Sequence, residues 1–600
     1  KVIYDAEVAA FERLKSRTKQ EGDRLFSIFL NEQLNVNDKS RVEIQWNRDF
    51  NNIVGVNYNK IPVAFRMNKY IGGQLLDVRP EKRDAVAFTT NNGSGLLAYD
   101  VGVGKTPSAI FTISQFIDLG YCSRPIVVVP NQTYKQWISE FESFAGHLKI
   151  NALYNLSDSI IADFKAVNGD TPELPNGSVT IVTYEGMKKI GFNEQTENNL
   201  FSSLTAILMQ STEDLSAKKA DRAAVKANAK TEALLGVALS RTKLDIEDLG
   251  IDYMCLDEAH AAKKVFTNVA GEAEENLGNS GKAVAKKSAY TLSAGTPSGN
   301  AIKAFTICQY IQRKTGGNTQ LLTATPFTNS PLEIYSMLSM ISHRELVKQN
   351  LENLNVFFDN FIEVSYEMVI NSKMKPQRKQ VILGYNNLIV MQDLIRRFIS
   401  YKTGEEVGVK RPNKIVIPLR EELVDNVRMK LPEEKQVDSI LPMSALQREL
   451  MDKITDYASG GADIACDNTS VGDDNESGEG SEEIDISTDA MDDKEKAGVR
   501  VLKALSWSRN LALSPYLFDC SGLGTPTYEQ YITTSNKLLY TMECIASIKA
   551  HHENNNTPQS GIVIYMDRGV KLFSLIKEWL VKKVGYSDDE VGIISSKLYS

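Results

Sequence analysis

The chain has 600 residues, of which 42% are hydrophobic and 24% are charged, and its formal net charge at pH 7 is −8. At about 150 residues per domain this length suggests about four domains, and the hydrophobic share is ample for several buried cores. The acid excess argues against a uniformly basic, nucleic-acid-binding surface, although much of it lies in residues 460–493 and leaves room for a local basic groove.

The six cysteines include no CxxC pair and do not cluster with the five histidines, so neither a disulfide framework nor a zinc site is expected. No apolar stretch is long enough to cross a bilayer, which argues against a membrane partner. The simplest interpretation is a protein of a reducing cytoplasm.

Residues 1–75 mix helical patterning with a polar, aromatic stretch, and we interpret them as an N-terminal cap. After them, short apolar runs alternate with helical segments. This alternation predicts a doubly wound α/β domain whose parallel strands are buried on both faces. The predicted strands are Leu96–Tyr99, Ile126–Pro130, Val179–Thr183, Tyr253–Leu256 and Gln320–Thr323.

The later part of the chain is less regular. Residues 195–248 are rich in Ala, Leu, Lys and Glu and contain no Pro, which predicts an inserted helical hairpin or arm. Helices with loops are expected over 331–458, and the Gly, Ser, Asp and Glu of 459–493 predict a disordered acidic loop. A second α/β unit then begins, with predicted strands at Gly561–Tyr565 and Val591–Ile594.

A glycine-rich turn follows the first predicted strand and precedes a helical pattern. Its residues are Gly102, Val103, Gly104, Lys105 and Thr106. Glycines let backbone N–H groups approach phosphates, and the following helix N-terminus adds positive potential. In this interpretation the turn binds ATP, Lys105 reaches the β and γ phosphates, and the Thr106 hydroxyl ligates Mg²⁺. The alternative is an ordinary glycine-rich turn, which the strand before it and the helix after it disfavour.

Two carboxylates directly follow the strand that ends at Leu256. Asp257 is predicted to hold Mg²⁺, and Glu258 to orient and deprotonate the attacking water. Nearby His260 is expected to report the nucleotide state to the next motif. The alternative is a pair of solvated acids at a strand end, which a P-loop upstream makes less attractive.

A threonine-rich segment, Leu322–Asn329, ends a further predicted strand. The hydroxyls of Thr323 and Thr325 are predicted to couple the hydrolysis site to a nucleic-acid face. The alternative is a strand followed by a proline turn.

These motifs, in this order, resemble the Swi/Snf-type branch of superfamily-two helicases. The closer resemblance is to the large helicase proteins of phages and conjugative elements, including DarB-like antirestriction proteins. It implies two RecA-like lobes, ATP and Mg²⁺ as cofactors, and double-stranded DNA as the partner. It also implies DNA contacts by Asn131, Gln136 and Thr183, and a bacterial host cytoplasm, with association with the virion as an alternative.

The sequence departs from the family pattern at several points. Lys82 stands where an adenine-contacting Gln is often found, which leaves the base selectivity for ATP open. The family's last motifs, including its arginine fingers, are absent from these residues, and we expect them beyond Ser600, with a methyltransferase or other domain as a further expectation. Arg396, Arg397 and Lys402 are candidates for phosphate contacts, but a solvated helix face is the preferred interpretation.

The leading hypothesis is a DNA-dependent ATPase that translocates on duplex DNA. The alternatives are a strand-separating DNA or RNA helicase, and a packaged or structural protein of a mobile element that retains the motor fold. In chain order we predict a cap (1–75), a first RecA-like lobe (76–340) with a helical insertion (195–248), a helical linker region (341–458), the acidic loop (459–493) and the start of a second, incomplete RecA-like lobe (494–600).

Overall fold

A computed structural model of the protein describes residues 18, 21–22, 24–50, 56–169, 173–208, 220–266, 268–270, 273–274, 287–288, 291–293, 297–328, 330–370, 376–409, 414–415, 421–424, 427–430, 441–461, 464, 493–559, 561–566 and 568–594. The chain divides into two compact units. The first comprises Lys1–Val369 and Pro376–Lys410, and the second comprises Ile370–Lys375 and Arg411–Ser600. Each unit is described by itself.

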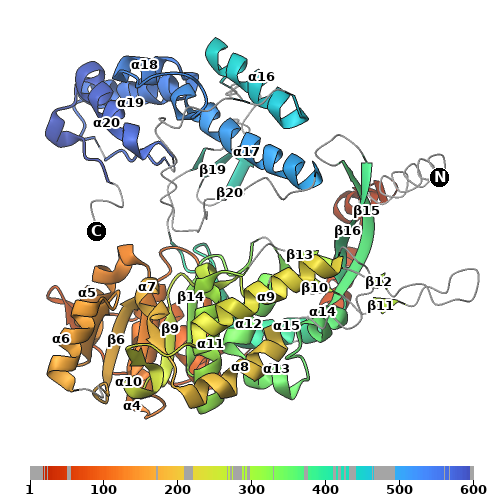
Figure 1. The fold of residues 1–600 in the computed structure, drawn as a ribbon, viewed down its shortest axis with the longest axis vertical. Coiled ribbons are helices and arrows are strands. Elements are labelled where there is room, and N and C mark those ends of the chain that lie inside the picture. The colour runs from red at the N-terminus through yellow and green to blue at the C-terminus, as the bar shows by residue number, and fades with distance from the viewer. Residues whose placement is uncertain are drawn as a thin grey trace, which may run out of the picture. The chain divides into compact units, whose positions relative to one another are not determined.

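The first unit is built on a seven-stranded sheet in which every pair of neighbours is parallel (Figure 1). All five strands predicted from apolar runs are present, so the α/β prediction is confirmed for this unit. In sheet order the strands are β17 (Ile399–Lys402), β3 (Gly95–Tyr99), β14 (Thr319–Thr323), β9 (Tyr253–Leu256), β4 (Pro125–Val129), β6 (Ser178–Thr183) and β5 (Lys149–Tyr154).

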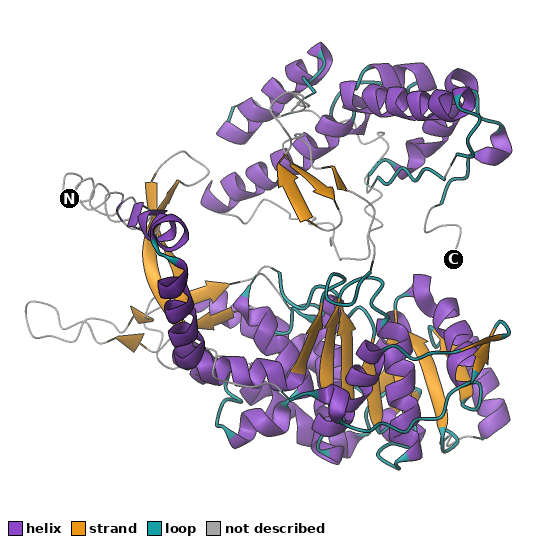
Figure 2. Ribbon diagram, turned by 180° about the vertical axis from the view of Figure 1, so that it is seen from behind, coloured by secondary structure: helices purple, strands orange, loops and turns teal. Residues whose placement is uncertain are grey.

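Successive side chains of the central strands enter opposite cores, which is why these strands read as continuous apolar runs. On β3, Leu97 and Tyr99 join a core with α3 (Pro80–Asn92), α4 (Lys105–Asp118) and α5 (Tyr134–Ala145). Leu96 and Ala98 join the core on the other face, with α11 (Gly299–Thr315) and α12 (Pro331–Ile341). Helices therefore cover both faces of the sheet (Figure 2).

Two helices, α8 (Glu194–Leu208) and α9 (Ala220–Leu239), occupy the segment in which a helical insertion is predicted, and α9 packs on α11. The other described elements of this unit are η1 (Phe29–Gln33), α2 (Val36–Phe50), η2 (Tyr58–Lys60), β1 (Tyr70–Ile71), β2 (Gln74–Leu75), η3 (Asn131–Thr133), α6 (Asp158–Asn168), α7 (Tyr184–Lys188), β7 (Ile190–Gly191), β8 (Leu244–Asp245), α10 (Ile246–Leu249), η4 (Ala259–Ala262), β10 (Asn268–Ala270), β11 (Ala273–Glu274), β12 (Lys287–Ser288), β13 (Thr291–Ser293), α13 (His343–Lys348), α14 (Leu354–Phe361) and α15 (Leu388–Phe398).

The expectation of helices and loops over 331–458 is incomplete. This segment also holds a two-stranded sheet of β15 (Ile362–Ile370) and β16 (Pro376–Tyr385), and the edge strand β17 of the main sheet. β17 has four residues, of which only Ile399 is buried. Such a short, half-exposed strand carries no continuous apolar run, and its pairing with β3 joins residues about 300 positions apart, so no local pattern announces it.

The second unit contains a small antiparallel sheet of β18 (Lys414–Ile415), β19 (Glu421–Val424) and β20 (Val427–Lys430). Its helices are α16 (Ala445–Ser459), α17 (Asp493–Leu513), α18 (Tyr528–Thr533), α19 (Asn536–Asn554) and α20 (Phe573–Trp579), with the short turns η7 (Pro515–Leu517), η8 (Val570–Leu572), η9 (Leu580–Val584) and η10 (Asp588–Glu590). The predicted acidic loop lies almost wholly outside the described residues. Cys520 is disulfide-bonded, in a chain for which the cysteine spacing predicts no disulfide framework.

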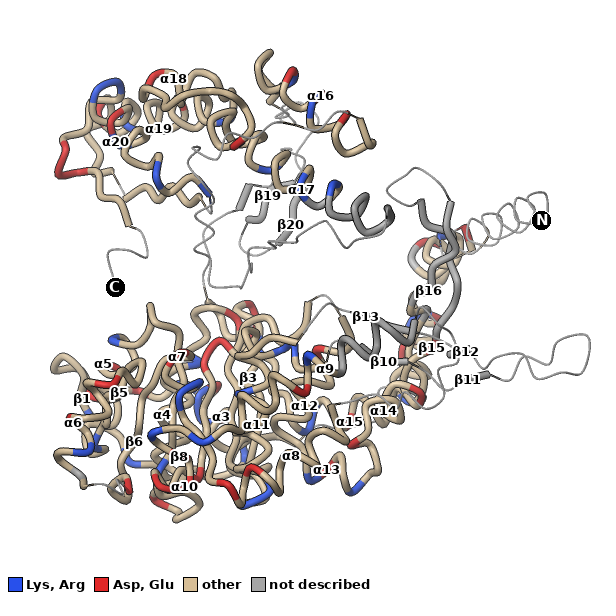
Figure 3. Tube along the Cα trace, viewed as in Figure 1, with Lys and Arg blue, Asp and Glu red and all other residues tan. Residues whose placement is uncertain are grey.

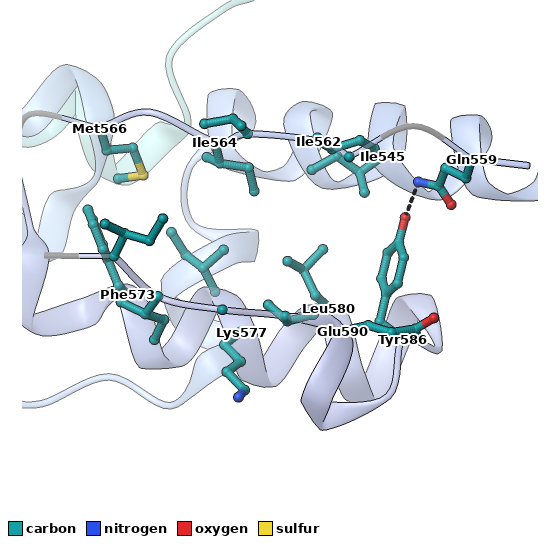
Figure 4. A pocket seen from close by; sticks show the side chains of 17 residues that line it. Ile545, Gln559, Ile562, Ile564, Met566, Phe573, Lys577, Leu580, Tyr586 and Glu590 are labelled. Atoms are coloured by element: carbon teal, nitrogen blue, oxygen red, sulfur yellow. Dashed lines mark hydrogen bonds between the residues drawn. The ribbon is translucent and has the colours of Figure 1, made fainter. Parts of the chain in front are cut away.

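The strands predicted at 561–565 and 591–594 are not formed: the described residues of both segments have no ladder partner. A lone apolar run cannot satisfy its backbone groups, so the run by itself does not make a strand. Both segments instead line a cavity of about 440 Å³ with residues of α19 and α20 (Figure 4). The side chain of Val563 is 90% exposed, and Gln559 Nε2 donates to the Tyr586 hydroxyl at 2.7 Å.

No helix among the described residues is both long enough and apolar enough to traverse a bilayer.

Lys and Arg are interspersed with Asp and Glu along the elements of the first unit (Figure 3).

We predict that Leu321→Ala lowers the free energy of unfolding of the first unit by about 3 kcal/mol, because Leu321 is fully buried on a strand paired on both sides. Urea unfolding followed by circular dichroism measures this change. The matched control is Leu119→Ala, whose side chain is 48% exposed and which should cost much less. Equal losses in both variants would contradict the central position given to β14.

Candidate functional site

The turn after β3 has the backbone of a phosphate cradle. Gly102 and Gly104 have φ angles of 87° and 100°, in the left-handed region that favours glycine. A Cβ at Gly104 would lie 2.8 Å from Cε of Lys82, so a side chain there would force a neighbour to move. Helix α4 begins directly after it, at Lys105, and its free N–H groups and dipole favour an anion. The backbone at Gly102, Val103 and Gly104 therefore has the conformation that the predicted phosphate-binding turn requires.

Lys105 and the acidic pair lie at the same edge of the sheet. The Lys105 ammonium donates to the carbonyl of Tyr99 at 3.1 Å. Its positive charge also acts on both carboxylates, lowering the pKa of Asp257 and of Glu258 relative to what their other surroundings would give. Residues about 150 positions apart are thus brought together, because β3 and β9 both flank β14.

Asp257 is a buried carboxylate, 5% exposed, with a donor on each oxygen. Trp137 Nε1 donates to Oδ2 at 2.8 Å, and the backbone N–H of Glu258 donates to Oδ1 at 3.0 Å. Burial raises the pKa of Asp257 to about 6, although the Trp137 hydrogen bond and Lys105 act in the opposite direction. The side chain is therefore held in a fixed orientation, and its negative charge at neutral pH destabilises the folded state.

Glu258 occupies a strained position. Its φ of 49° and ψ of 48° lie in the left-handed region, which costs a non-glycine residue on the order of 1 kcal/mol or more. The Tyr184 hydroxyl lies 2.6 Å from the carbonyl oxygen of Asp257 and 3.1 Å from that of Glu258, and it holds this turn in place. His260 Nδ1 lies 3.1 Å from the Glu258 carboxylate, and this hydrogen bond is the largest cause of the lowered pKa of Glu258. Glu258 is therefore ionised at neutral pH.

His260 connects the acid to the end of β14. Its Nδ1 lies 3.2 Å from the Thr323 hydroxyl as well as beside Glu258. Because an ionised carboxylate can only accept a hydrogen bond, Nδ1 must carry the proton. The backbone N–H of Thr325 in turn donates to the Thr323 hydroxyl at 3.1 Å. Of the predicted coupling residues, His260 and Thr323 touch, whereas Thr325 joins through its backbone and leaves its side chain exposed.

A buried ion pair, which the sequence analysis did not single out, lies beyond this link. Lys263 Nζ is 3.4 Å from the Glu333 carboxylate and donates to the Thr328 hydroxyl at 2.6 Å. The other Glu333 oxygen accepts from the backbone N–H of Thr328 at 2.7 Å. The network joins the turn after the acidic pair to the start of α12. A lysine six residues after Asp257 is the only sequence signal for it.

The residues predicted to contact DNA lie in different environments. Asn131, on η3, and Gln136, in the first turn of α5, are both exposed, and Gln136 Nε2 donates to Glu140 Oε1 at 2.7 Å. Thr183 is fully buried, and its hydroxyl accepts from the N–H of Gly186 at 3.3 Å as the N-cap of α7. Its side chain is therefore a structural cap rather than an exposed contact.

Two of the basic residues proposed for phosphate contact have carboxylate partners within the chain. Arg397 lies 3.2 Å from Glu345, and Lys402 lies 3.4 Å from Asp84. These ion pairs favour the interpretation preferred above, in which the residues belong to a solvated face of the protein and do not contact DNA phosphates.

The donors at the site suit a magnesium nucleotide. The Thr106 hydroxyl and the Asp257 carboxylate are hard oxygen ligands of the kind that Mg²⁺ prefers, and Lys105 with the P-loop amides suits phosphate oxygens. Within the described part of the chain, no group of three or more His, Cys, Asp or Glu side chains is arranged to hold a metal. Phosphate oxygens and water would have to complete the coordination of the ion.

Comparison with known proteins places this site in a family context. Residues 39–284 match the SNF2-related domain. The chain is 22% identical over 361 residues to "Defense against restriction protein B" of Escherichia phage P1, covering 53% of this chain and 15% of that protein. It is 37% identical over 59 residues to "ATP-dependent helicase fft1" of Schizosaccharomyces pombe, covering 10% of this chain and 6% of that protein.

A third relative is "Chromatin remodeling factor mit1" of the same yeast, at 27% identity over 96 residues, covering 16% of this chain and 7% of that protein. Among solved structures, the SWI2/SNF2 ATPase core of Sulfolobus solfataricus in complex with dsDNA aligns with a TM-score of 0.30 and 13% identity, over 85% of this chain and 71% of that one. The chain spans 15% or less of the length of these curated relatives. The resemblance to the Swi/Snf branch and to DarB-like proteins is confirmed by the domain match and the phage relative.

We predict that Asp257→Asn stabilises the nucleotide-free protein above pH 6, by up to about 3 kcal/mol for a pKa raised from 3.8 to about 6. Because the folded pKa lies above the unfolded one, the ionised carboxylate destabilises the fold. The advantage of Asn should therefore be full above pH 6, shrink as the pH falls from 6 towards 4, and vanish near pH 4. Urea unfolding in EDTA at several pH values measures it. A pH-independent difference between variant and parent would contradict the assignment.

Proposed function

We propose that the chain is the ATP-hydrolysing motor of a superfamily-two DNA translocase, which uses ATP and Mg²⁺ to move along double-stranded DNA. The observation that carries the proposal is that Lys105, after β3, acts electrostatically on both Asp257 and Glu258, after β9. A P-loop lysine beside two carboxylates at the carboxyl edge of a parallel sheet is the constellation that binds and cleaves a nucleoside triphosphate.

In this proposal the P-loop amides and Lys105 bind the phosphates, and Thr106 and Asp257 hold the metal. When bound, magnesium supplies charge neutralisation to the phosphates. Glu258 orients the attacking water and accepts its proton, a role that suits a carboxylate kept ionised by His260. His260 and Thr323 then link this acid to the end of β14. Hydrolysis depends mainly on positioning and charge, and in this proposal these groups of the first unit supply the phosphate, metal and water positions.

The DNA partner is proposed from the Swi/Snf resemblance and from the exposed start of α5. Gln136 lies in the first turn of α5 and Asn131 on the preceding η3, after the strand next to β9, and both residues are exposed. Contacts from such side chains to the phosphates of DNA would position the protein on a duplex without reading its base sequence. The relatives include a protein named as an ATP-dependent helicase and one named as a chromatin remodeling factor, which supports a nucleic-acid-dependent ATPase.

Strand separation is the second candidate, because one relative carries the name of a helicase. A translocase displaces a third strand from a triplex without opening the duplex, whereas a helicase releases a labelled strand from a duplex. Running both assays on the same protein separates the two functions. A protein that binds DNA and ATP but is inactive in both assays would instead favour a structural role in a mobile element.

We predict that Glu258→Gln lowers DNA-stimulated ATP hydrolysis at least about a hundredfold, because an amide cannot take the proton from water. Phosphate release measures the rate, and binding of a fluorescent ATP analogue should change little. The control is Glu142→Gln, an exposed acid on α5, which should keep the parental rate. Equal hydrolysis by Glu258→Gln and the parent would remove the enzymatic proposal.

We also predict that Lys82→Gln raises the preference for ATP over GTP by roughly tenfold. Lys82 lies against Gly104, and the next residue, Arg83, lines a cavity of about 650 Å³ together with Tyr58 and Pro80. A glutamine amide matches the N6 and N7 groups of adenine, whereas an ammonium donates to O6 and N7 of guanine, a difference of about 1–3 kcal/mol for a good pair.

Competition of ATP and GTP for the hydrolysis site measures this preference, with Lys69→Gln, an exposed lysine of the N-terminal region that does not line this cavity, as the control. A ratio unchanged by Lys82→Gln would exclude Lys82 from base recognition.

A further inference from the structure

We infer that Trp137 is a positioning residue through which the DNA-side helix α5 controls the orientation of the Asp257 carboxylate, so that DNA binding regulates the metal site. The inference rests on the proposed function, since it requires DNA at the start of α5 and a magnesium nucleotide at Asp257. It adds a physical route between the two sites that runs through one side chain.

The contact itself is buried and direct. Trp137 is 1% exposed, and its Nε1 donates to Asp257 Oδ2 at 2.8 Å. An indole N–H is a donor only, and a carboxylate is an acceptor only, so the direction of this hydrogen bond is fixed. The other oxygen, Oδ1, is held by the N–H of Glu258 at 3.0 Å. Each oxygen keeps a second lone pair for a metal. Groups that orient a metal ligand in this way typically change metal affinity or activity 10- to 100-fold when removed.

Helix α5 is braced so that its movement would reach the indole. Trp137 lies near the start of α5. Tyr134, one turn earlier, lies edge-on to Tyr154 at 4.9 Å, and its hydroxyl accepts from the Tyr154 N–H at 2.9 Å. Gln136, the residue before Trp137, is exposed. Gln136 and Trp137 are neighbours on one helix. A duplex bound at Gln136 therefore acts on the helix that carries Trp137, whose indole holds the Asp257 carboxylate.

A second route ends at the same place. Tyr184 follows Thr183 in the other predicted DNA-side segment, and its hydroxyl bridges the carbonyls of Asp257 and Glu258 at 2.6 and 3.1 Å. Trp137 thus fixes the side chain of Asp257, while Tyr184 fixes the backbone of the pair. Neither residue reaches solvent to any large extent, so each acts by holding another group.

The test removes the donor and keeps the aromatic ring. Trp137→Phe is compared with Phe141→Leu, which perturbs the packing of the same helix without touching Asp257. Three quantities are measured for each protein: the kcat and KM for ATP with and without duplex DNA, the affinity for the duplex, and the Mg²⁺ concentration needed to bind N-methylanthraniloyl-ATP. Should Trp137→Phe not fold, 3-benzothienylalanine at this position replaces the N–H by sulfur and keeps the shape.

We expect Trp137→Phe to require about tenfold more Mg²⁺ for nucleotide binding and to lose about tenfold in DNA-stimulated kcat. The KM for ATP at saturating Mg²⁺ and the affinity for DNA should stay within about twofold, because the phosphate and DNA contacts are intact. Phe141→Leu should keep the parental Mg²⁺ requirement and DNA stimulation.

An unchanged Mg²⁺ requirement and DNA stimulation in Trp137→Phe, or equal losses in Phe141→Leu, would overturn the inference while leaving the proposed ATPase intact. Absence of ATP hydrolysis in the parent protein would overturn the proposed function and the inference with it. A parent that hydrolyses ATP without any response to DNA would overturn the inference and the DNA dependence, but not the ATPase.

Discussion

The burial of one carboxylate, Asp257, is the constraint on which the site depends. Taking this charge out of water raises its pKa, and the fold retains it only by surrounding it with compensating groups. Those groups are an indole donor from α5, a backbone N–H from the next residue and the positive charge of Lys105. Each comes from a different part of the chain, so the position of one side chain determines how three segments meet.

The backbone of Glu258, the residue after Asp257, is also strained. Glu258 adopts a left-handed conformation, and Tyr184 and His260 hold its backbone and its carboxylate. Strained backbone of this kind persists where surrounding contacts over-determine it, and it is concentrated at functional sites. The buried Lys263–Glu333 ion pair extends the network to α12. The result is a continuous set of polar contacts from the end of β9 to the start of α12, on an edge where a nucleotide would bind.

The parallel sheet explains why these contacts are available at all. Its central strands alternate their side chains between two cores, so the strands themselves offer almost no polar group to solvent. Polar residues are left at the carboxyl ends, where the chain turns out of the sheet. Asp100 follows the end of β3, Asp257 follows the end of β9, and Thr323 is the last residue of β14. The polar side chains of the site therefore lie along one edge of the sheet.

The sequence by itself determined the features that depend on neighbouring residues. Strands buried on both faces must be apolar runs, and the phosphate turn needs glycine at φ angles near 90°, so Leu96–Tyr99, Tyr253–Leu256 and the Gly102–Thr106 turn could be predicted. Only the tertiary structure decided the features that need a distant partner: β17 as the seventh strand, Trp137 on Asp257, Thr183 as a buried cap, and the failure of 561–565 to form a strand. Strand pairing, burial and hydrogen bonding between remote residues are properties of the packed chain, and no periodicity along the sequence records them.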